Sequence, residues 1–156
     1  MTQPAPVAHH WGGEGLVRQP LGDDRESKEG TLKYLCLVYA EEKRIAALSG
    51  SEWDALVVEN LELCEELRKS GHYVSASPLD SVQTAATVRM RNGKLSTIDG
   101  PFAETKEQLG GYYLIEARDL NEAIQVAGRI PGARLGSIEV RRIQAHDPRE
   151  PWARHG

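Results

Sequence analysis

The sequence predicts one α+β domain in which an antiparallel sheet carries two helices on one face. Three observations lead to this prediction. Apolar segments of strand length alternate with two longer segments of helical period. An Asn-Gly pair, the strongest short signal for a hairpin, joins two of the strands. The chain has 156 residues, 40% of them hydrophobic, which is enough for one compact core.

The predicted elements follow one another over most of the chain. Two helices are expected, at residues 51–70 and 119–130. Six strands are expected, at residues 32–40, 72–77, 85–91, 94–99, 112–117 and 137–143. This β-α-β-(ββ)-β-α-β order is that of a ferredoxin-like split βαβ domain with an additional hairpin.

The first helix contains one polar residue on its inward face. Ser51, with Asp54 three residues later, is expected to cap its start, and Gly71 to end it. The inward stripe is expected to consist of Trp53, Leu56, Val57, Asn60, Cys64 and Leu67. A buried amide without partners costs about 1–3 kcal/mol, so Asn60 needs a partner. That partner is either a backbone carbonyl or sheet edge, or a ligand to which the amide is presented.

The chain divides into a patterned region and two polar ends. Residues 1–30 are rich in proline, glycine and charge without a period of 2 or 3.6, which predicts a flexible arm. A start codon placed too far upstream would give the same pattern. Residues 31–144 form the predicted domain, and residues 145–156 a polar tail.

Composition excludes several classes of function. The net charge of -4, with both signs interleaved, provides no cationic surface for nucleic acid. Since the sequence contains neither an apolar run of membrane-spanning length nor a secretory signal, we expect a soluble cytoplasmic protein without a membrane partner. Cys36 and Cys64 have no further ligand at metal-binding spacing, so they are interpreted as buried thiols. No metal or other cofactor is predicted.

The predicted fold leaves one face of the sheet uncovered. If both helices cover the same face, the opposite face of the first strand still presents large apolar side chains. These are either Leu35, Leu37 and Tyr39 or Tyr34, Cys36 and Val38. A second copy of the sheet would cover them, so we predict a homodimer packed face to face.

The segment after the hairpin is the candidate functional site. A two-residue turn at Asn92-Gly93 pairs Arg91 with Lys94 and places Asp99 at the end of a largely apolar row. Gly100 and Pro101 then predict a turn into a short helix at residues 102–109. Asp99 is either a helix cap, which is the commoner role of such a residue, or a carboxylate prepared for acid–base work.

A small-molecule pocket between the sheet and this short helix is one interpretation. Asp99 would be its tentative catalytic acid or base, and Lys106 would bind an anionic group. The other candidate ligand-binding residues are Asn60, His72, Phe102, Glu104 and Tyr112. Alternatively, the domain is a non-enzymatic regulatory or interaction module, and Lys106 only pairs with a neighbouring carboxylate. Whether the protein is an enzyme therefore stays open at this point.

The run Asp99-Gly100-Pro101-Phe102-Ala103-Glu104-Thr105-Lys106-Glu107, followed by residues 109–115, resembles the signature of the YCII-related family of the DGPF type. The similarity extends from residue 33 to residue 140 and covers about three quarters of the chain. The resemblance implies a dimeric α/β barrel, bacterial and cytoplasmic, of uncertain activity. It also implies a possible link to extracytoplasmic-function sigma factors.

The resemblance also implies a histidine and aspartate pair in a cleft, and the chain departs from that pattern. Many family members of this type carry a histidine in the first helix, whereas residues 58–62 here contain none. Asparagine does not exchange protons near neutral pH as imidazole does. If the family chemistry needs that base, this chain uses His72, uses Asp99 with a second carboxylate, or performs no reaction.

Overall fold

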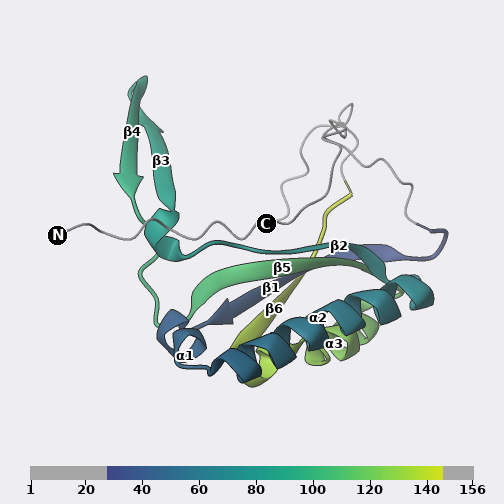
Figure 1. The fold of residues 1–156 in the computed structure, drawn as a ribbon. Helices are drawn as coiled ribbons and strands as arrows, with labels where there is room; N and C mark the ends of the chain where they lie inside the picture. The colour runs from purple at the N-terminus through teal and green to yellow at the C-terminus, as the bar shows by residue number, and fades with distance from the viewer. Residues whose placement is uncertain (1–27, 146–156) are drawn as a thin grey trace, which may run out of the picture.

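The computed structural model describes residues 28–145, and these form an α+β domain of two layers with a projecting hairpin (Figure 1). The main sheet consists of β1 (Leu32–Ala40), β2 (Tyr73–Pro78), β5 (Gln108–Ala117) and β6 (Ser137–Arg142). Two longer helices, α2 (Gly50–Ser70) and α3 (Leu120–Gly128), cover one face of it. The mixed α+β fold predicted from the sequence is therefore confirmed.

The strand order of the main sheet is β2-β5-β1-β6, and every neighbouring pair is antiparallel. Consequently β1 and β2 run parallel with β5 between them, and β5 and β6 run parallel with β1 between them. Each of α2 and α3 connects one of these split pairs, so both connections cross the same face. This explains why the two helices lie side by side beneath the sheet in Figure 1.

The hairpin of β3 (Ala86–Arg91) and β4 (Lys94–Asp99) forms a second sheet of its own. Arg91 pairs with Lys94 across the turn, as the Asn-Gly pair predicts. Asn92 and Gly93 both have positive φ, at 50° and 72°, which is the conformation that this tight turn requires. The hairpin stands away from the main sheet on the side opposite to the helices (Figure 1).

Three short helical segments accompany these elements: α1 (Glu42–Ala46) after β1, η1 (Val82–Thr84) before the hairpin, and η2 (Pro131–Arg134) after α3. None of them was expected from the sequence, because segments of three to five residues show no readable period. Among residues 28–145, no helix is both long and apolar enough to cross a membrane.

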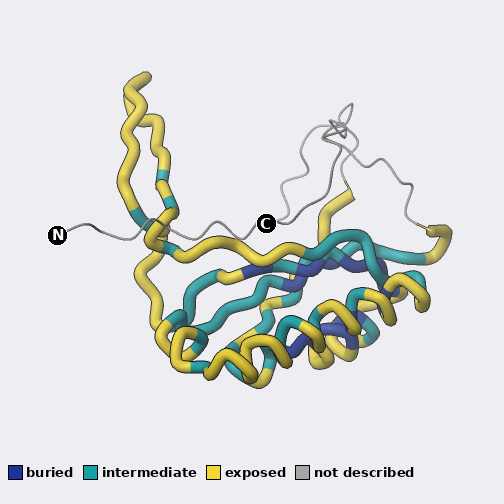
Figure 2. Tube along the Cα trace, viewed as in Figure 1, coloured by how far each residue is buried: buried dark blue, intermediate teal, exposed yellow. Residues whose placement is uncertain are grey.

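The core lies between the main sheet and the two long helices (Figure 2). Alternate residues of β1, Tyr34 and Cys36, are buried against the helices, and burial raises the pKa of the Cys36 thiol to about 11. The remaining buried hydrophobic residues are Leu63, Leu67, Tyr113, Ile115, Ala117, Ala123, Val126, Ala127 and Ile130.

The register of α2 differs from the sequence prediction. Trp53 is half exposed, whereas Leu63, absent from the predicted stripe, is buried. The helix begins at Gly50, one residue earlier than expected, and its cap is Ser49 rather than Ser51, because Ser49 and Glu52 form a reciprocal capping box. The Ser49 amide donates to Glu52 Oε2 at 2.8 Å, and the Glu52 amide donates to Ser49 Oγ at 3.2 Å.

Gly136 permits a close approach between the start of β6 and the end of β1. A Cβ at this position would lie 1.9 Å from the carbonyl oxygen of Tyr39 and 2.9 Å from Ala40 Cα. Both of those atoms are backbone, so a larger residue forces the two strands apart.

We therefore predict that Gly136→Ala lowers the free energy of unfolding by at least about 2 kcal/mol, measured by urea denaturation. The matched control is Gly128→Ala at the end of α3, where an added Cβ meets no atom within 4 Å. That control is expected to leave stability unchanged or raise it by up to about 1 kcal/mol. Equal effects of the two substitutions would contradict this account.

Candidate functional site

The segment that follows β4 is an extended loop rather than the expected short helix. Residues 101–107 have no helical structure, and β5 begins at Gln108. Gly111, expected to lie just beyond a helix end, is inside β5, where a Cβ would come within 3.0 Å of the Ser77 carbonyl oxygen. Gly111 therefore permits close strand packing and does not end a helix, so the helix prediction is wrong.

The turn at Gly100 anchors the base of the hairpin. Its φ of 104° is accessible to glycine and strained for other residues. The Gly100 amide donates to the Ala85 carbonyl at 2.7 Å, and Thr87 Oγ1 donates to the Gly100 carbonyl at 2.9 Å. The first half of the signature stretch thus holds together the two chain segments from which the hairpin projects.

Three predicted site residues lie in or next to this turn and are exposed. Asp99 ends β4 and pairs with Ala86 across the hairpin. The Phe102 side chain is 78% exposed, and the Arg89 guanidinium lies 5.6 Å from the centre of its ring. Glu104 is exposed in the loop that leads to β5. Within one copy of the described chain, these three side chains do not enclose a pocket.

A shallow depression lies further along the same loop, where it meets the ends of β1 and β6. It has a volume of about 540 Å³ and is open to solvent. Its lining residues are Tyr39, Glu41, Thr105, Lys106, Glu107, Ser137 and Glu139. Of the predicted site residues, Lys106 alone belongs to this set.

Polar contacts hold the walls of the depression in place. Lys106 Nζ lies 3.3 Å from Glu41 Oε1, so the lysine of the signature pairs with a carboxylate of its own chain. Ser137 Oγ donates to Glu107 Oε2 at 2.8 Å, which joins the loop to β6. The Glu42 amide donates to Gln108 Oε1 at 3.1 Å and so ties the start of α1 to β5.

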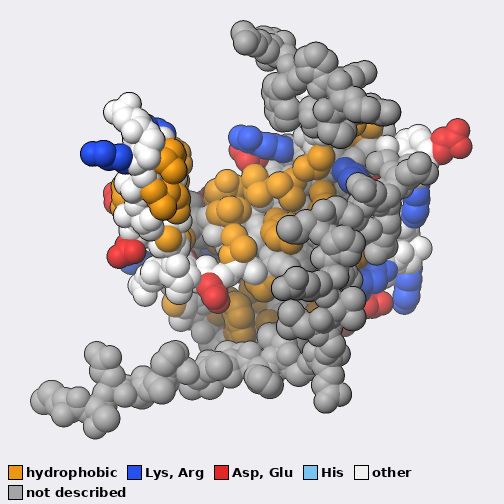
Figure 3. Space-filling view, turned by 90° about the horizontal axis from the view of Figure 1, so that it is seen from above, with side chains coloured by type: hydrophobic (Ala, Val, Ile, Leu, Met, Phe, Trp, Pro, Cys, Tyr) orange, Lys and Arg blue, Asp and Glu red, His pale blue; other side chains and the backbone are white. Residues whose placement is uncertain are grey.

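The depression lies at one end of the uncovered face of the main sheet. Leu35 pairs with Leu114, and Leu37 with Tyr112, across β1 and β5. These residues alternate with the buried ones that face the helices, so they point to the other side and are only partly buried. Figure 3 looks down on this side and shows hydrophobic side chains gathered over the sheet. We call this side, with Leu35, Leu37, Tyr112 and Leu114, the open face of the sheet. It includes Tyr112, one of the predicted site residues.

The sequence offered little signal for the depression. Its residues come from three separate segments that the strand register brings together, and single carboxylates after strands are common on any surface. Leu35, Leu37 and Tyr39 are every second residue of β1, so their side chains share one face of the sheet. This pattern is the one from which the position of Tyr39 at the edge of that face can be inferred.

The amide of Asn60 is used within the protein. Its Nδ2 donates to the Leu56 carbonyl at 2.8 Å, which is the backbone partner considered from the sequence. Its Oδ1 accepts from the Tyr113 hydroxyl beneath the sheet. Burial raises the pKa of Tyr113, so this hydroxyl stays protonated and remains a donor.

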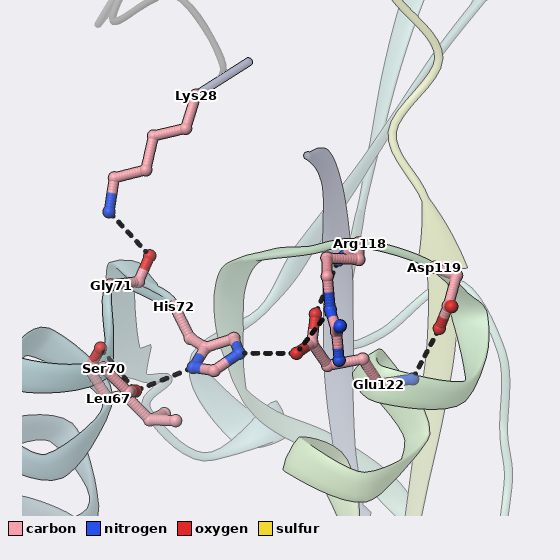
Figure 4. A network of polar contacts seen from close by, with 8 residues as sticks. All are labelled: Lys28, Leu67, Ser70, Gly71, His72, Arg118, Asp119 and Glu122. Atoms are coloured by element: carbon pink, nitrogen blue, oxygen red, sulfur yellow. Dashed lines mark hydrogen bonds and ion pairs between the residues drawn. The ribbon is translucent and has the colours of Figure 1, made fainter. Parts of the chain in front are cut away.

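His72 lies at the other end of the domain and connects the two long helices (Figure 4). Its Nδ1 is 2.7 Å from Ser70 Oγ at the end of α2, and its Nε2 is 3.4 Å from Glu122 Oε1 in α3. Glu122 also accepts from the Arg118 amide at 2.6 Å. His72 does not approach the depression lining, and its contacts fasten one helix end to the other.

Removing the Asn60 amide should destabilise the fold, because the Tyr113 hydroxyl then loses its acceptor. We expect Asn60→Ala to lower the free energy of unfolding by about 1–3 kcal/mol. In a Tyr113→Phe background the same substitution should lower the free energy of unfolding by clearly less. The measurement is urea denaturation of the wild type, the two single variants and the double variant. Equal costs in both backgrounds would contradict the pairing.

The Glu122 contacts predict a pH dependence of stability. The backbone hydrogen bond from Arg118, followed by the contacts with His72 and the Arg118 side chain, lowers the pKa of Glu122 below its ordinary value of 4.5. A carboxyl whose pKa is lowered by folding stabilises the protein above the ordinary value. This stabilisation disappears as the pH falls through the folded-state pKa.

Accordingly, Glu122→Gln should lower the free energy of unfolding at pH 6–7 and have a diminishing effect below about pH 4.5. The measurement is urea denaturation at a series of pH values, with Glu62→Gln on the exposed side of α2 as a control. An effect of Glu122→Gln that stays constant from pH 3 to pH 7 would disprove the assignment.

Two comparisons with known proteins bear on this chain. Residues 32–147 match the model of a family described as the YCII-related domain. An uncharacterized protein of Rhizobium meliloti (strain 1021) is 34% identical over 119 residues, which cover 75% of this chain and 96% of that relative. The matched region includes every described strand and helix and all the residues that line the depression. The chain therefore belongs to the YCII-related domain family.

Proposed function

We propose that the chain forms a homodimer through the open faces of two main sheets, and that the depression beside Lys106 binds a small polar molecule at this interface. One observation carries the proposal: Tyr39, which lines the depression, follows Leu35 and Leu37 on the same side of β1. The assembly would be the dimeric barrel that the sequence resemblance implies.

The apolar character of the open face supports the dimer. Leu35, Leu37, Tyr112 and Leu114 lie next to one another on β1 and β5, and both long helices lie on the other side. Burying apolar surface contributes about 25 cal/mol per Å², so solvent contact over this area is unfavourable. A second identical sheet offers a surface of the same kind and size, and two-fold symmetry closes the assembly.

The chemistry of the depression supports a polar ligand that carries hydrogen-bond donors. Carboxylates of Glu41, Glu107 and Glu139 and the hydroxyl of Ser137 outnumber the single cation, Lys106. Tyr39 supplies an aromatic wall. Amine or hydroxyl groups of a ligand suit this lining better than a phosphate or carboxylate does. A second copy over the open face would exclude water and strengthen these hydrogen bonds.

Asp99 stays part of the proposal as a tentative acid or base, with Phe102 and Glu104 beside it. It lies at the base of the hairpin, on the side of the sheet where the second copy is placed. Cover by that copy would remove water from around the carboxylate, as acid–base work in a closed site requires.

A non-enzymatic interaction module is the second candidate, and the exposed apolar residues of the hairpin favour it. In that case the hairpin would contact a different protein, such as a component of sigma-factor signalling, and the depression would bind nothing. The two candidates differ in whether small molecules stabilise the purified protein.

A thermal-shift screen of small polar metabolites tests the proposal. A ligand present at about 100 times its dissociation constant contributes about 2.7 kcal/mol, which should raise Tm by roughly 5–10 °C. Ser137→Ala and Glu139→Gln should abolish the shift, whereas Lys69→Gln on the exposed end of α2 should retain it.

Asp99→Asn is expected to keep the shift, because Asp99 does not line the depression. A screen in which no compound stabilises the protein, or a shift that survives both depression variants, would refute the proposed site.

A further inference from the structure

The β3–β4 hairpin is built as an arm. Its two strands pair with each other and with no strand of the main sheet. Its base is fixed by the hydrogen bonds of Gly100 to Ala85 and of Thr87 to Gly100. A lone two-stranded hairpin is at best marginally stable in water, so an arm of this kind needs a surface against which to pack.

The two faces of the arm differ in chemistry. Val88, Met90 and Leu95 lie on one face by the strand register, and their exposed fractions are 59%, 57% and 64%. The opposite face carries three cations together with polar residues and Ile98: Thr87, Arg89, Arg91, Lys94 and Ser96. Three neighbouring apolar side chains that are more than half exposed mark a contact surface.

The apolar face of the arm borders the same space as the open face of the sheet. The arm rises on the side opposite to the helices (Figure 1), and its hydrophobic side chains are turned toward the sheet in Figure 3. The arm and the sheet therefore form two walls of one apolar recess. The cationic side chains point out of this recess, where they remain in water.

The height of the arm indicates what the recess holds. Six residues per strand extend over about 20 Å, whereas two sheets packed face to face lie about 10 Å apart. The arm therefore extends well past any small molecule seated on the sheet. It is long enough to pass along the flank of a folded layer.

We propose that the apolar row Val88, Met90 and Leu95 packs against the body of a second copy of this chain that sits on the open face. The inference rests on the homodimer proposed above and adds that each copy grips the other with its arm. An unrelated partner would have to match two apolar walls at once. A second copy presents a matching sheet face and a reciprocal arm through one two-fold axis.

Paired substitutions within the hairpin test this inference. Met90 and Leu95 are directly opposite each other, as are Arg91 and Lys94 on the other face of the same strands. Met90→Thr with Leu95→Thr removes apolar contact and keeps residues that favour strands. Arg91→Thr with Lys94→Thr is the matched control. The dimer dissociation constant of the full chain is measured by sedimentation equilibrium.

We expect the apolar pair to raise the dissociation constant by about 100-fold, since both arms lose their anchors. The control pair should change it by less than about threefold, and far-UV circular dichroism should be the same for both. Leu37→Thr, on the open face, is measured in parallel.

The possible failures are distinguishable. If Leu37→Thr weakens association and the apolar arm pair does not, the arm inference is wrong and the proposed dimer stands. If the arm pair instead lowers Tm without changing the association state, the arm packs within its own chain, and the inference is again wrong. A wild-type chain that stays monomeric at millimolar concentration overturns both the proposed homodimer and the arm inference.

Discussion

The placement of both long helices on one side of a four-stranded sheet is the constraint on which the rest of the structure depends. β1 has apolar residues on both faces, but α2 and α3 cover only the face that carries Tyr34 and Cys36. Since sequential split βαβ connections of the same handedness place both helices on the same face, no helix or strand among residues 28–145 covers the apolar side chains of β1 and β5 on the opposite face. The open face, the depression at its end and the recess beside the arm all follow from that arrangement.

The signature stretch divides into two parts with different structural roles. Asp99 to Phe102 form the turn that fixes the base of the arm, where Gly100 adopts a backbone conformation that suits glycine. Thr105 to Glu107 form one wall of the depression, where Glu107 accepts from Ser137 of β6 and Lys106 pairs with Glu41 just before α1. A single stretch of sequence thus positions both the arm and the proposed site, which accounts for its density of turn residues and charges.

Strong local patterns made much of the fold predictable. The Asn92-Gly93 hairpin, the helix ending at Gly71 and the alternation of β1 depend on neighbouring residues and are read directly from the sequence. The loop at residues 101–107 was misread because Pro101 and the Gly110-Gly111 pair have the spacing of a helix start and end. The use of Gly111 for contact with Ser77 is a tertiary effect. Likewise, the sequence does not reveal the partners of His72 and Asn60, because Glu122 and Tyr113 lie 50 or more residues away.

The central claim is that a second copy covers the open face, and solvent access to that face tests it most directly. Methyl groups of Leu35, Leu37 and Leu114 can be compared with that of Leu61, which is 54% exposed on α2, by NMR relaxation from a soluble paramagnetic probe. The account predicts weak relaxation of the three sheet methyl groups at high protein concentration, and strong relaxation once the sample is diluted below the dissociation constant. Strong relaxation at every concentration, or protection that dilution does not remove, would contradict it.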